Sequence, residues 1–271
     1  MNVAVTGSTG LLGSALVPRL TSGSHGVVRL VRGTPATASG ERVARWDPDT
    51  GAVEPGLDGV DAVVHLAGES VAGGRWTEAR KRRIRESRVH ATRRLCETLA
   101  RLSRPPRVLV AASAIGYYGD RGDQVLREES APGAGFLPEV CREWEAAAEP
   151  AARRGIRVVH LRIGLVLSPK GGALAAMLPV FRLGLGGPVG AGAQWMSWIA
   201  LEDEVGVIQY ALSHPEIQGP INLVAPTPLT NREFTKTLGK VLRRPTIFPV
   251  PAPMLRLLMG EDVLDHSGLD Y

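Results

Sequence analysis

The chain has 271 residues, of which 32 are basic and 27 acidic, giving a formal net charge of +5. The two signs are interspersed, which argues against a nucleic-acid-binding surface. Cys96 and Cys141 lack the spacing of metal ligands, and no apolar run reaches the roughly 18 residues that cross a bilayer. We therefore expect a cytoplasmic protein with a sizeable core, no metal site, and no nucleic-acid or membrane partner.

Short apolar, β-branched runs alternate with helix-period stretches along the first part of the chain. The runs predict strands at residues 3–5, 27–31, 62–66, 108–112 and 158–161, and the stretches predict helices at 12–20, 77–102 and 137–153. Strands that alternate with helices favour an α/β fold of the Rossmann type, a doubly wound parallel sheet.

Glycine and proline become frequent from Pro169 onward. This change in composition predicts a smaller, loop-rich substrate-side region with helices at about 202–213 and 230–242. We accordingly expect a Rossmann domain at 1–168 and the smaller region at 169–271.

The segment "TGSTGLLG" places Gly7, Gly10 and Gly13 directly after the first predicted strand and at the start of a helix. In this context glycines permit a tight turn, let backbone N–H groups approach a pyrophosphate, and let the helix pack closely on the sheet. The turn therefore predicts a dinucleotide site; the alternative is a glycine-rich surface loop.

The end of the second predicted strand bears on the choice of cofactor. An acidic residue near this point holds the ribose 2′-hydroxyl of NAD in many Rossmann proteins. Here "VVRLVRGT" supplies no acid and ends in Arg32, whose guanidinium suits bidentate binding of a 2′-phosphate. NADP(H) is therefore favoured over NAD(H), with a solvated strand-end charge as the alternative for Arg32.

Ordered motifs along the chain resemble the extended short-chain dehydrogenase/reductase superfamily, and more specifically its atypical, epimerase-like subfamily. Members are commonly labelled NAD-dependent epimerase/dehydratase-like, and some cell-division inhibitor-like. The motifs are "TGSTGLLG", "VDAVVHLAGES", "RWTEARKRRIRESR", "VLVAASAIGYYGD", "VCREWEAAA", "LRIGLVLSPKGGAL", "FRLGLGGPVGAG" and "QWMSWIALED".

The resemblance implies a Rossmann fold and a set of residues along the dinucleotide. These are Gly7, Thr9, Gly10, Leu11, Leu12, Gly13, Val31, Arg32, Leu66, Ala67, Arg88 and Val166. It also implies that a further small helical segment follows Gly260-Glu261, where this chain instead reads "DVLDHSGLDY". We expect that the last segment of the family is missing here.

Typical members of the superfamily use a tyrosine whose pKa is lowered by a lysine four residues later. The tyrosines of this chain are Tyr117, Tyr118, Tyr210 and Tyr271, and none is followed at that distance by lysine. The resemblance places the pair on the helix at 137–153, where apolar residues and Cys141 stand instead. Cys141 is interpreted as a small core residue.

Four residues remain as catalytic candidates. Ser113 matches the family's serine that binds the substrate oxygen, or else satisfies backbone groups at a strand end. Tyr117 and Tyr118 offer a phenol, although packing roles are favoured. Glu145 is either a general base or, as the favoured interpretation, a solvated helix residue.

Aromatic and polar side chains recur in "QWMSWIALED". Gln194, Trp195, Ser197 and Trp198 either wall a substrate pocket or pack in the core of a turn.

Arg88 interrupts an otherwise apolar helix face. Ile84, Arg88, Ala91, Leu95, Leu99 and Leu102 recur at helical spacing. A guanidinium turned toward a sheet needs an anion or several acceptors. The alternatives are a buried partner such as Glu69 and, as the resemblance favours, the cofactor.

Two functions follow from these features. The leading one is an NADP(H)-dependent oxidoreductase or epimerase/dehydratase-like enzyme acting on a small molecule. Its alternative is a non-catalytic NADP(H)-binding regulatory or scaffold protein, for example one related to cell division. The sequence does not determine the oligomeric state, and a homodimer is possible.

Overall fold

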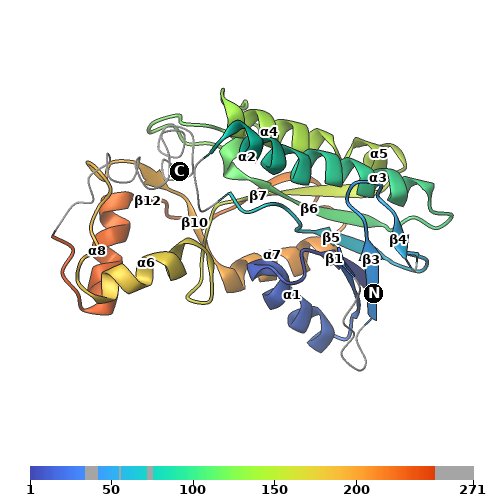
Figure 1. Ribbon diagram of the computed structural model, residues 1–271, viewed down its shortest axis with the longest axis horizontal. Helices are drawn as coiled ribbons and strands as arrows, with labels where there is room; N and C mark the ends of the chain where they lie inside the picture. The colour runs from blue at the N-terminus through green and yellow to red at the C-terminus, as the bar shows by residue number, and fades with distance from the viewer. Residues whose placement is uncertain (34–41, 55, 72–75, 248–271) are drawn as a thin grey trace.

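The computed structural model describes residues 1–33, 42–54, 56–71 and 76–247 (Figure 1). The sequence after Gly260-Glu261 lies outside these ranges. An eight-stranded sheet in the order β11-β7-β6-β5-β1-β2-β3-β4 forms the centre of the fold. Its strands are β1 (Asn2–Thr6), β2 (Gly26–Val31), β3 (Arg42–Trp46), β4 (Val53–Glu54), β5 (Ala62–His65), β6 (Val108–Ala114), β7 (Arg157–Ile163) and β11 (Gly219–Leu223).

All neighbours in this sheet are parallel except β3 and β4. The strand order reverses between β1 and β5, because the chain first winds outward through β2 and β3 and then returns to the other side of β1. Ligands of doubly wound sheets bind outside the carboxyl ends of the strands at such a reversal. The fold therefore places the site at the ends of β1, β2 and β5.

Helices cover both faces of the sheet, as Figure 1 shows. One face carries α1 (Leu11–Ser22) and α7 (Leu201–Ser213), and the other carries α2 (Glu78–Arg85), α3 (Ala91–Arg101), α4 (Phe136–Ala146) and α5 (Glu149–Arg153). Two apolar cores result: β-branched residues such as Val5 and Val64 pack toward α1 and α7, whereas Val63 and Leu109 pack toward Leu95 and Leu99 of α3. Burial on both faces explains the continuous apolar runs in these strands.

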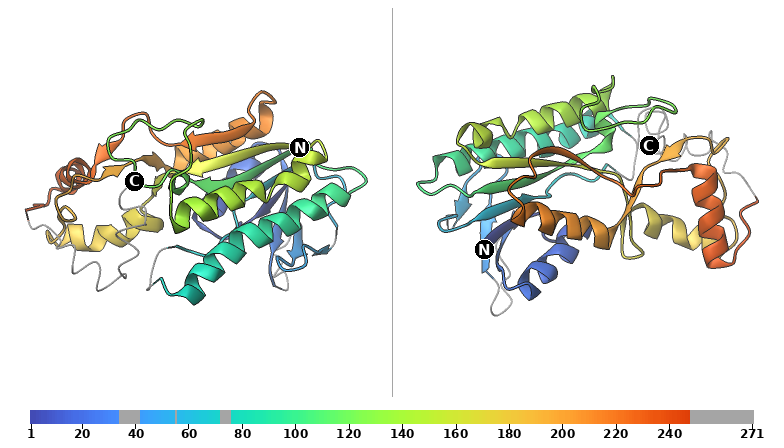
Figure 2. Two further views of the ribbon diagram at one scale, coloured as in Figure 1. Left: turned by 90° about the horizontal axis from the view of Figure 1, so that it is seen from above. Right: turned by 180° about the vertical axis from the view of Figure 1, so that it is seen from behind.

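A smaller lobe stands beside the carboxyl ends of the strands (Figure 2). It consists of α6 (Gly172–Arg182), α8 (Asn231–Leu242) and the pair β9 (Trp195–Met196) with β12 (Leu229–Thr230). The parallel pair β8 (Leu165–Leu167) and β10 (Trp198–Ala200) leads into it. None of the helices in the described ranges is long and apolar enough to cross a bilayer.

The α/β fold with a parallel, doubly wound sheet is confirmed, and each of the five predicted strands has its counterpart. Both α7 and β11 come from the part of the chain after residue 169, yet they belong to the large sheet and its covering layer. The smaller region therefore interleaves with the Rossmann domain along the chain.

The predicted helix at 77–102 is present but contains a π-helical turn, Glu86–His90, between α2 and α3. Ile84, Ala91, Leu95 and Leu99 are buried as the periodicity predicts. A π turn inserts one extra residue into a helix and often marks a functional site. It brings residues of this helix toward the carboxyl ends of the strands.

Glu204 is an exception to the apolar packing around α7. Its side chain is 0% exposed, and both carboxyl oxygens lack a hydrogen-bond partner among the described residues. Burial disfavours the charged form and raises the pKa of this carboxyl to about 8. Glu204 is therefore protonated in the folded protein at neutral pH and ionised when the chain unfolds.

This pKa shift predicts how the stability of the protein depends on pH. Because the folded-state pKa is raised, the contribution of Glu204 to stability is present below pH 4.5 and is lost as the pH rises toward 8. The variant Glu204→Gln, which cannot ionise, should melt at a temperature that exceeds that of the wild type by a margin that grows between pH 5 and pH 8. Exposed Glu202→Gln on the same helix is the control, and a constant margin for Glu204→Gln would contradict the assignment.

Candidate functional site

The glycine turn after β1 is shaped by close backbone contacts. Gly7 has a φ of +67°, and a Cβ there would lie 2.7 Å from the carbonyl carbon of Leu66 at the end of β5. A Cβ on Gly13 would lie 2.6 Å from the Cα of Ser8, so α1 packs directly on the turn. No other residue fits at either position without displacing backbone. The turn thus forms a bare cradle at the N-terminus of α1, as a pyrophosphate requires.

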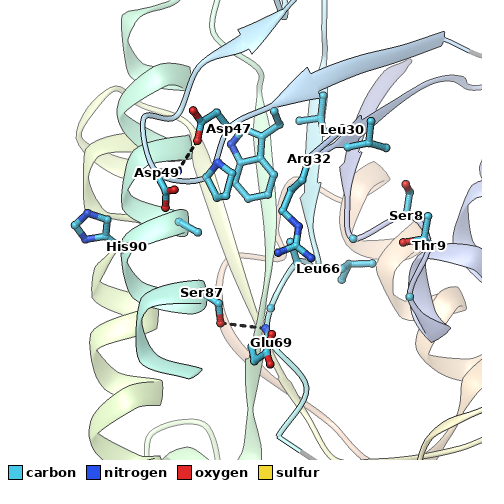
Figure 3. A pocket seen from close by; sticks show the side chains of 18 of the residues that line it. Ser8, Thr9, Leu30, Arg32, Asp47, Asp49, Leu66, Glu69, Ser87 and His90 are labelled. Carbon is cyan, nitrogen blue, oxygen red and sulfur yellow. Dashed lines mark hydrogen bonds between the residues drawn. The ribbon is translucent and has the colours of Figure 1, made fainter. Parts of the chain in front are cut away.

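A cleft of about 980 Å³ opens beside this turn (Figure 3). Five segments line it: the glycine turn, the end of β2, the end of β3, the chain after β5, and the helix around the π turn. The lining residues are 7–10, 30–32, 45–49, 66–69, 83, 86, 87, 90 and 91. Its position at the reversal of strand order and its size suit an extended nucleotide.

The structure brings seven of the twelve predicted dinucleotide residues to this cleft. They are Gly7, Thr9, Gly10, Val31, Arg32, Leu66 and Ala67. Figure 3 shows the Arg32 side chain pointing into the cavity between Thr9 and the wall that carries Asp49 and Ser87.

Five predicted dinucleotide residues do not line the cleft: Leu11, Leu12, Gly13, Arg88 and Val166. Leu11 lies 3.2 Å from the position of a Cβ on Gly171, in the loop that follows β8, and packs with Val166 beside the core. Contacts of these residues with a dinucleotide stay a prediction.

Several residues that line the cleft were not identified from the sequence. The turn from β3 to β4 contributes residues 46–49, in which the Asp47 carboxylate accepts a 2.9 Å hydrogen bond from the Asp49 amide. That bond is the main reason that the pKa of Asp47 is lowered. On the opposite wall, Ser87 accepts a 3.0 Å hydrogen bond from the amide of Glu69. Asp47 and Asp49 follow a strand, and Ser87 lies in a π turn, that hydrophobic periodicity alone does not predict.

A buried histidine holds the cleft's backbone in place. The Thr6 hydroxyl accepts hydrogen bonds from the amides of Leu66 and Ala67, at 3.1 and 3.2 Å, and lies 2.7 Å from His65 Nδ1. Because two amides already donate to Thr6, its own proton is free for Nδ1, which assigns the His65 proton to Nε2. Burial lowers the pKa of His65 to about 4, so the ring is neutral.

A polar centre lies at the end of β6, the strand next to β5. The Ser113 hydroxyl donates a 2.7 Å hydrogen bond to Glu145 Oε1 of α4. Arg162 of β7 binds the same carboxylate through Nε and Nη2, both at 2.9 Å. Their side chains are 3% exposed for Arg162 and 13% for Glu145, so Glu145 is not a solvated helix residue.

Arg162 was not identified from the sequence, although it belongs to the motif "LRIGLVLSPKGGAL". Burial acts to lower its pKa, but hydrogen bonds with Glu145 and Tyr118 outweigh that effect and raise it. The guanidinium therefore stays charged where it binds the carboxyl group of Glu145. Only the fold reveals this pair, because the two residues lie on separate elements.

The two neighbouring tyrosines have structural partners. The Tyr118 hydroxyl donates to Asn222 Oδ1 at 2.6 Å and accepts from Arg162 Nη1 at 2.9 Å. Burial raises its pKa, so Tyr118 is a poor proton donor. The Tyr117 ring lies 3.6 Å from the guanidinium carbon of Arg162 and stacks on it. Packing on Arg162 is thus the observed role of both phenols.

Three of the remaining candidates are held in local contacts. Burial raises the pKa of the Cys141 thiol to about 12, which fits its interpretation as a core residue. The Trp195 indole donates a 2.6 Å hydrogen bond to Asp123, and that of Trp198 donates to the Thr227 carbonyl at 3.1 Å. Neither tryptophan lines the cleft.

Arg88 lies directly behind the cleft. Its Nη1 donates to the carbonyl oxygens of Glu69 at 2.9 Å and Ile84 at 3.3 Å, and its guanidinium carbon is 5.1 Å from the Trp144 ring. Glu69, the partner named as one alternative, does contact Arg88, through its backbone carbonyl rather than a salt bridge, and its charge also acts on the guanidinium. Among the described residues, Nε and Nη2 have no hydrogen-bond partner, and burial lowers the pKa of this guanidinium.

The glycine cradle and the cleft at the strand reversal define a Rossmann-type nucleotide-binding protein. The chain belongs to the NAD dependent epimerase/dehydratase family, whose pattern it matches over residues 3–223. It is 44% identical over 260 residues to the epimerase family protein Mb2239 of Mycobacterium bovis, covering 96% of this chain and 85% of the relative.

Two solved structures extend the comparison. Human epimerase family protein SDR39U1, crystallised with NADPH, is 33% identical with a TM-score of 0.89, covering 98% of this chain and 89% of that one. A nucleoside-diphosphate sugar epimerase from Corynebacterium glutamicum is 40% identical with a TM-score of 0.77, covering 99% of this chain and 58% of that one. The resemblance to an atypical, epimerase-like short-chain dehydrogenase is thereby confirmed.

Proposed function

We propose that this protein is an NADP(H)-dependent oxidoreductase or epimerase/dehydratase-like enzyme that acts on a small molecule. The observation that carries the proposal is the hydrogen bond from Ser113 to a Glu145 carboxylate, 2.7 Å long, near the cofactor cleft. It supplies a proton path where the usual tyrosine and lysine are missing.

The cleft supports NADP(H) as the dinucleotide. Gly7 and Gly13 leave the cradle free of side chains, and Arg32 points into the cavity where an acidic residue would disfavour a 2′-phosphate (Figure 3). The NADPH bound to human SDR39U1, a close structural neighbour, supports the same choice. A bound nicotinamide dinucleotide supplies a hydride donor or acceptor.

The position of Ser113 in the sheet supports a role beside such a dinucleotide. His65 of β5 lies opposite Ala111 of β6 in the sheet. Ala67, two residues after His65, lines the cleft, and Ser113 lies two residues after Ala111, at the same level on the neighbouring strand. Ser113 Oγ accepts the proton of a substrate hydroxyl while its own proton passes to Glu145 Oε1. For a substrate carbonyl the two transfers run in reverse. Arg162 is a positioning residue that holds Glu145 toward Ser113.

The cytoplasm is the compartment we propose for this activity, because both cysteines are free thiols buried in the fold. A different function, dinucleotide binding without catalysis in a regulatory or scaffold role, has one observation in its favour. Ser113 is almost completely buried, and its single proton is already engaged by Glu145.

A direct assay separates these functions. We expect calorimetry to show tighter binding of NADPH than of NADH, and NADPH oxidation with at least one member of a panel of carbonyl compounds and nucleotide sugars. Tight binding with no turnover across the panel would favour the non-catalytic role. Equal affinities for the two dinucleotides would refute the cofactor assignment.

Removing the Ser113 hydroxyl should break the proton path. We expect Ser113→Ala to lower kcat by about 100-fold or more, the range of general acid–base catalysis, with little change in NADPH affinity. Ser213→Ala, which removes an exposed hydroxyl at the far end of α7, is the matched control. An unchanged kcat in Ser113→Ala would exclude Ser113 from the reaction.

A substitution of Arg88 tests whether this residue binds the dinucleotide or only stabilises the fold. If its unpartnered Nε or Nη2 reaches the dinucleotide past Gly68, Arg88→Ala should weaken NADPH binding by about 1.5–3 kcal/mol, the range for a hydrogen bond to a charged group. Exposed Arg93→Ala on α3 serves as the control for loss of charge. A variant that melts earlier yet binds NADPH with wild-type affinity would make Arg88 a purely structural residue.

A further inference from the structure

We infer that Arg45 of β3 is a second phosphate-binding residue in the cleft and that it shares the 2′-phosphate of the dinucleotide with Arg32 of β2. The inference rests on the proposed NADP(H) binding and names a specificity residue within that site. The observations that carry it are the register of β2 with β3, the place of both residues in the lining of the cleft, and the absence of a salt bridge to either arginine within the described part of the chain.

The strand register brings the two arginines to the same end of two neighbouring strands. In the parallel pairing of β2 and β3, Val31 lies opposite Arg45, so Arg45 is beside the residue that precedes Arg32. Both side chains are exposed and both line the cleft, together with Ser8 of the glycine turn. Partner residues in neighbouring strands project to the same face of a sheet, so Arg45 shares the face of Val31 and Arg29 that α1 covers further along. Arg32 follows the last residue of β2 and lines the cleft from beyond the end of that strand.

The Ser8 hydroxyl adds a neutral donor to this group of cations. Arg29 Nε donates a 3.3 Å hydrogen bond to Ser8 Oγ, which leaves the hydroxyl proton of Ser8 available to an acceptor in the cleft. Ser8 precedes Thr9, and Figure 3 shows both side chains on the wall opposite Asp49 and His90. The donors therefore converge from the glycine turn and from two adjacent strands.

Neither Arg32 nor Arg45 forms an ion pair within the described part of the chain. Glu54 is the cross-strand neighbour of Arg45 in the antiparallel pair of β3 and β4, yet no nitrogen–oxygen distance between them falls within the 4.0 Å of a salt bridge. By contrast, Arg85, Arg94, Arg153 and Arg162 each have a carboxylate partner. An anion that enters the cleft therefore has no salt bridge of these two arginines to displace, although the charge of Arg45 acts on the carboxylate of nearby Asp47 and lowers its pKa.

The charge of the ligand explains why two guanidinium groups would be used. A phosphate monoester carries a charge of about −1.5 to −2 at neutral pH, and one exposed arginine neutralises only part of it. Guanidinium groups from two strands can each donate hydrogen bonds to a different phosphate oxygen. Discrimination against NAD(H) should therefore be shared between Arg32 and Arg45.

The test uses adenosine 2′,5′-bisphosphate and adenosine 5′-monophosphate as probes, with calorimetry on the full chain. We expect Arg45→Gln to weaken binding of the bisphosphate by about 5- to 20-fold, as expected for losing a charge-assisted hydrogen bond at an exposed site, while binding of the monophosphate stays within about twofold. Arg45→Lys should retain part of the affinity. Arg32→Gln should show a loss of the same kind, and the double variant should lose most of the preference.

Arg42→Gln is the matched control, because it removes the same charge from the same strand but lies outside the cleft, near Asn2. If Arg45→Gln behaves like Arg42→Gln while Arg32→Gln loses bisphosphate affinity, the inference about Arg45 is wrong and the proposed cofactor stands. If the wild type binds both probes equally, the proposed NADP(H) preference itself fails. A lower melting temperature of Arg45→Gln with unchanged binding would show that Arg45 has a structural role and takes no part in binding the phosphate.

Discussion

The buried ring of His65 is the contact on which the rest of the site depends. One ring nitrogen accepts from Thr6 at the end of β1, and the other donates to Thr92 of α3 at 2.9 Å. The Trp144 indole of α4 donates to the same Thr92 hydroxyl, also at 2.9 Å. A chain of neutral hydrogen bonds therefore crosses the core from the glycine turn to the helix that carries Glu145. Because each member is buried, the loss of one partner would leave its neighbours unsatisfied.

This arrangement couples the two halves of the site. Thr6 fixes the backbone of Leu66 and Ala67, which forms one wall of the dinucleotide cleft, while Trp144 precedes Glu145, which accepts the proton of Ser113. A shift of α4 relative to α3 would break the hydrogen bond from Trp144 to Thr92, and Glu145 would move with the helix. Rigid spacing of cofactor and proton acceptor is what hydride chemistry needs from a protein.

The sequence predicted the parts of this structure that repeat a local pattern. Alternating apolar runs were enough for β1, β2, β5, β6 and β7, and the glycine spacing was enough for the cradle at Gly7 and Gly13. The strand β3, which lies next to the edge strand β4, was missed because "RVARW" mixes charged with apolar residues and buries only part of its length. The pairing of Glu145 with Arg162 was missed for another reason: a contact between a helix and a strand has no period along the chain.

The polar groups of the site differ from the tyrosine–lysine pair of typical members of the superfamily. Cys141 stands where the resemblance places that pair, and two guanidinium groups, those of Arg88 and Arg162, lower the pKa of its thiol without overcoming the effect of burial. The thiol therefore stays neutral and takes no part in proton transfer. Arg162 is committed to Glu145, whereas Arg88 keeps donors free beside the cleft. The negative charge at the centre is thus confined to one carboxylate, and Ser113 is its only observed hydroxyl donor among the described residues. In the proposed reaction, a proton exchanged with the substrate passes through that hydrogen bond.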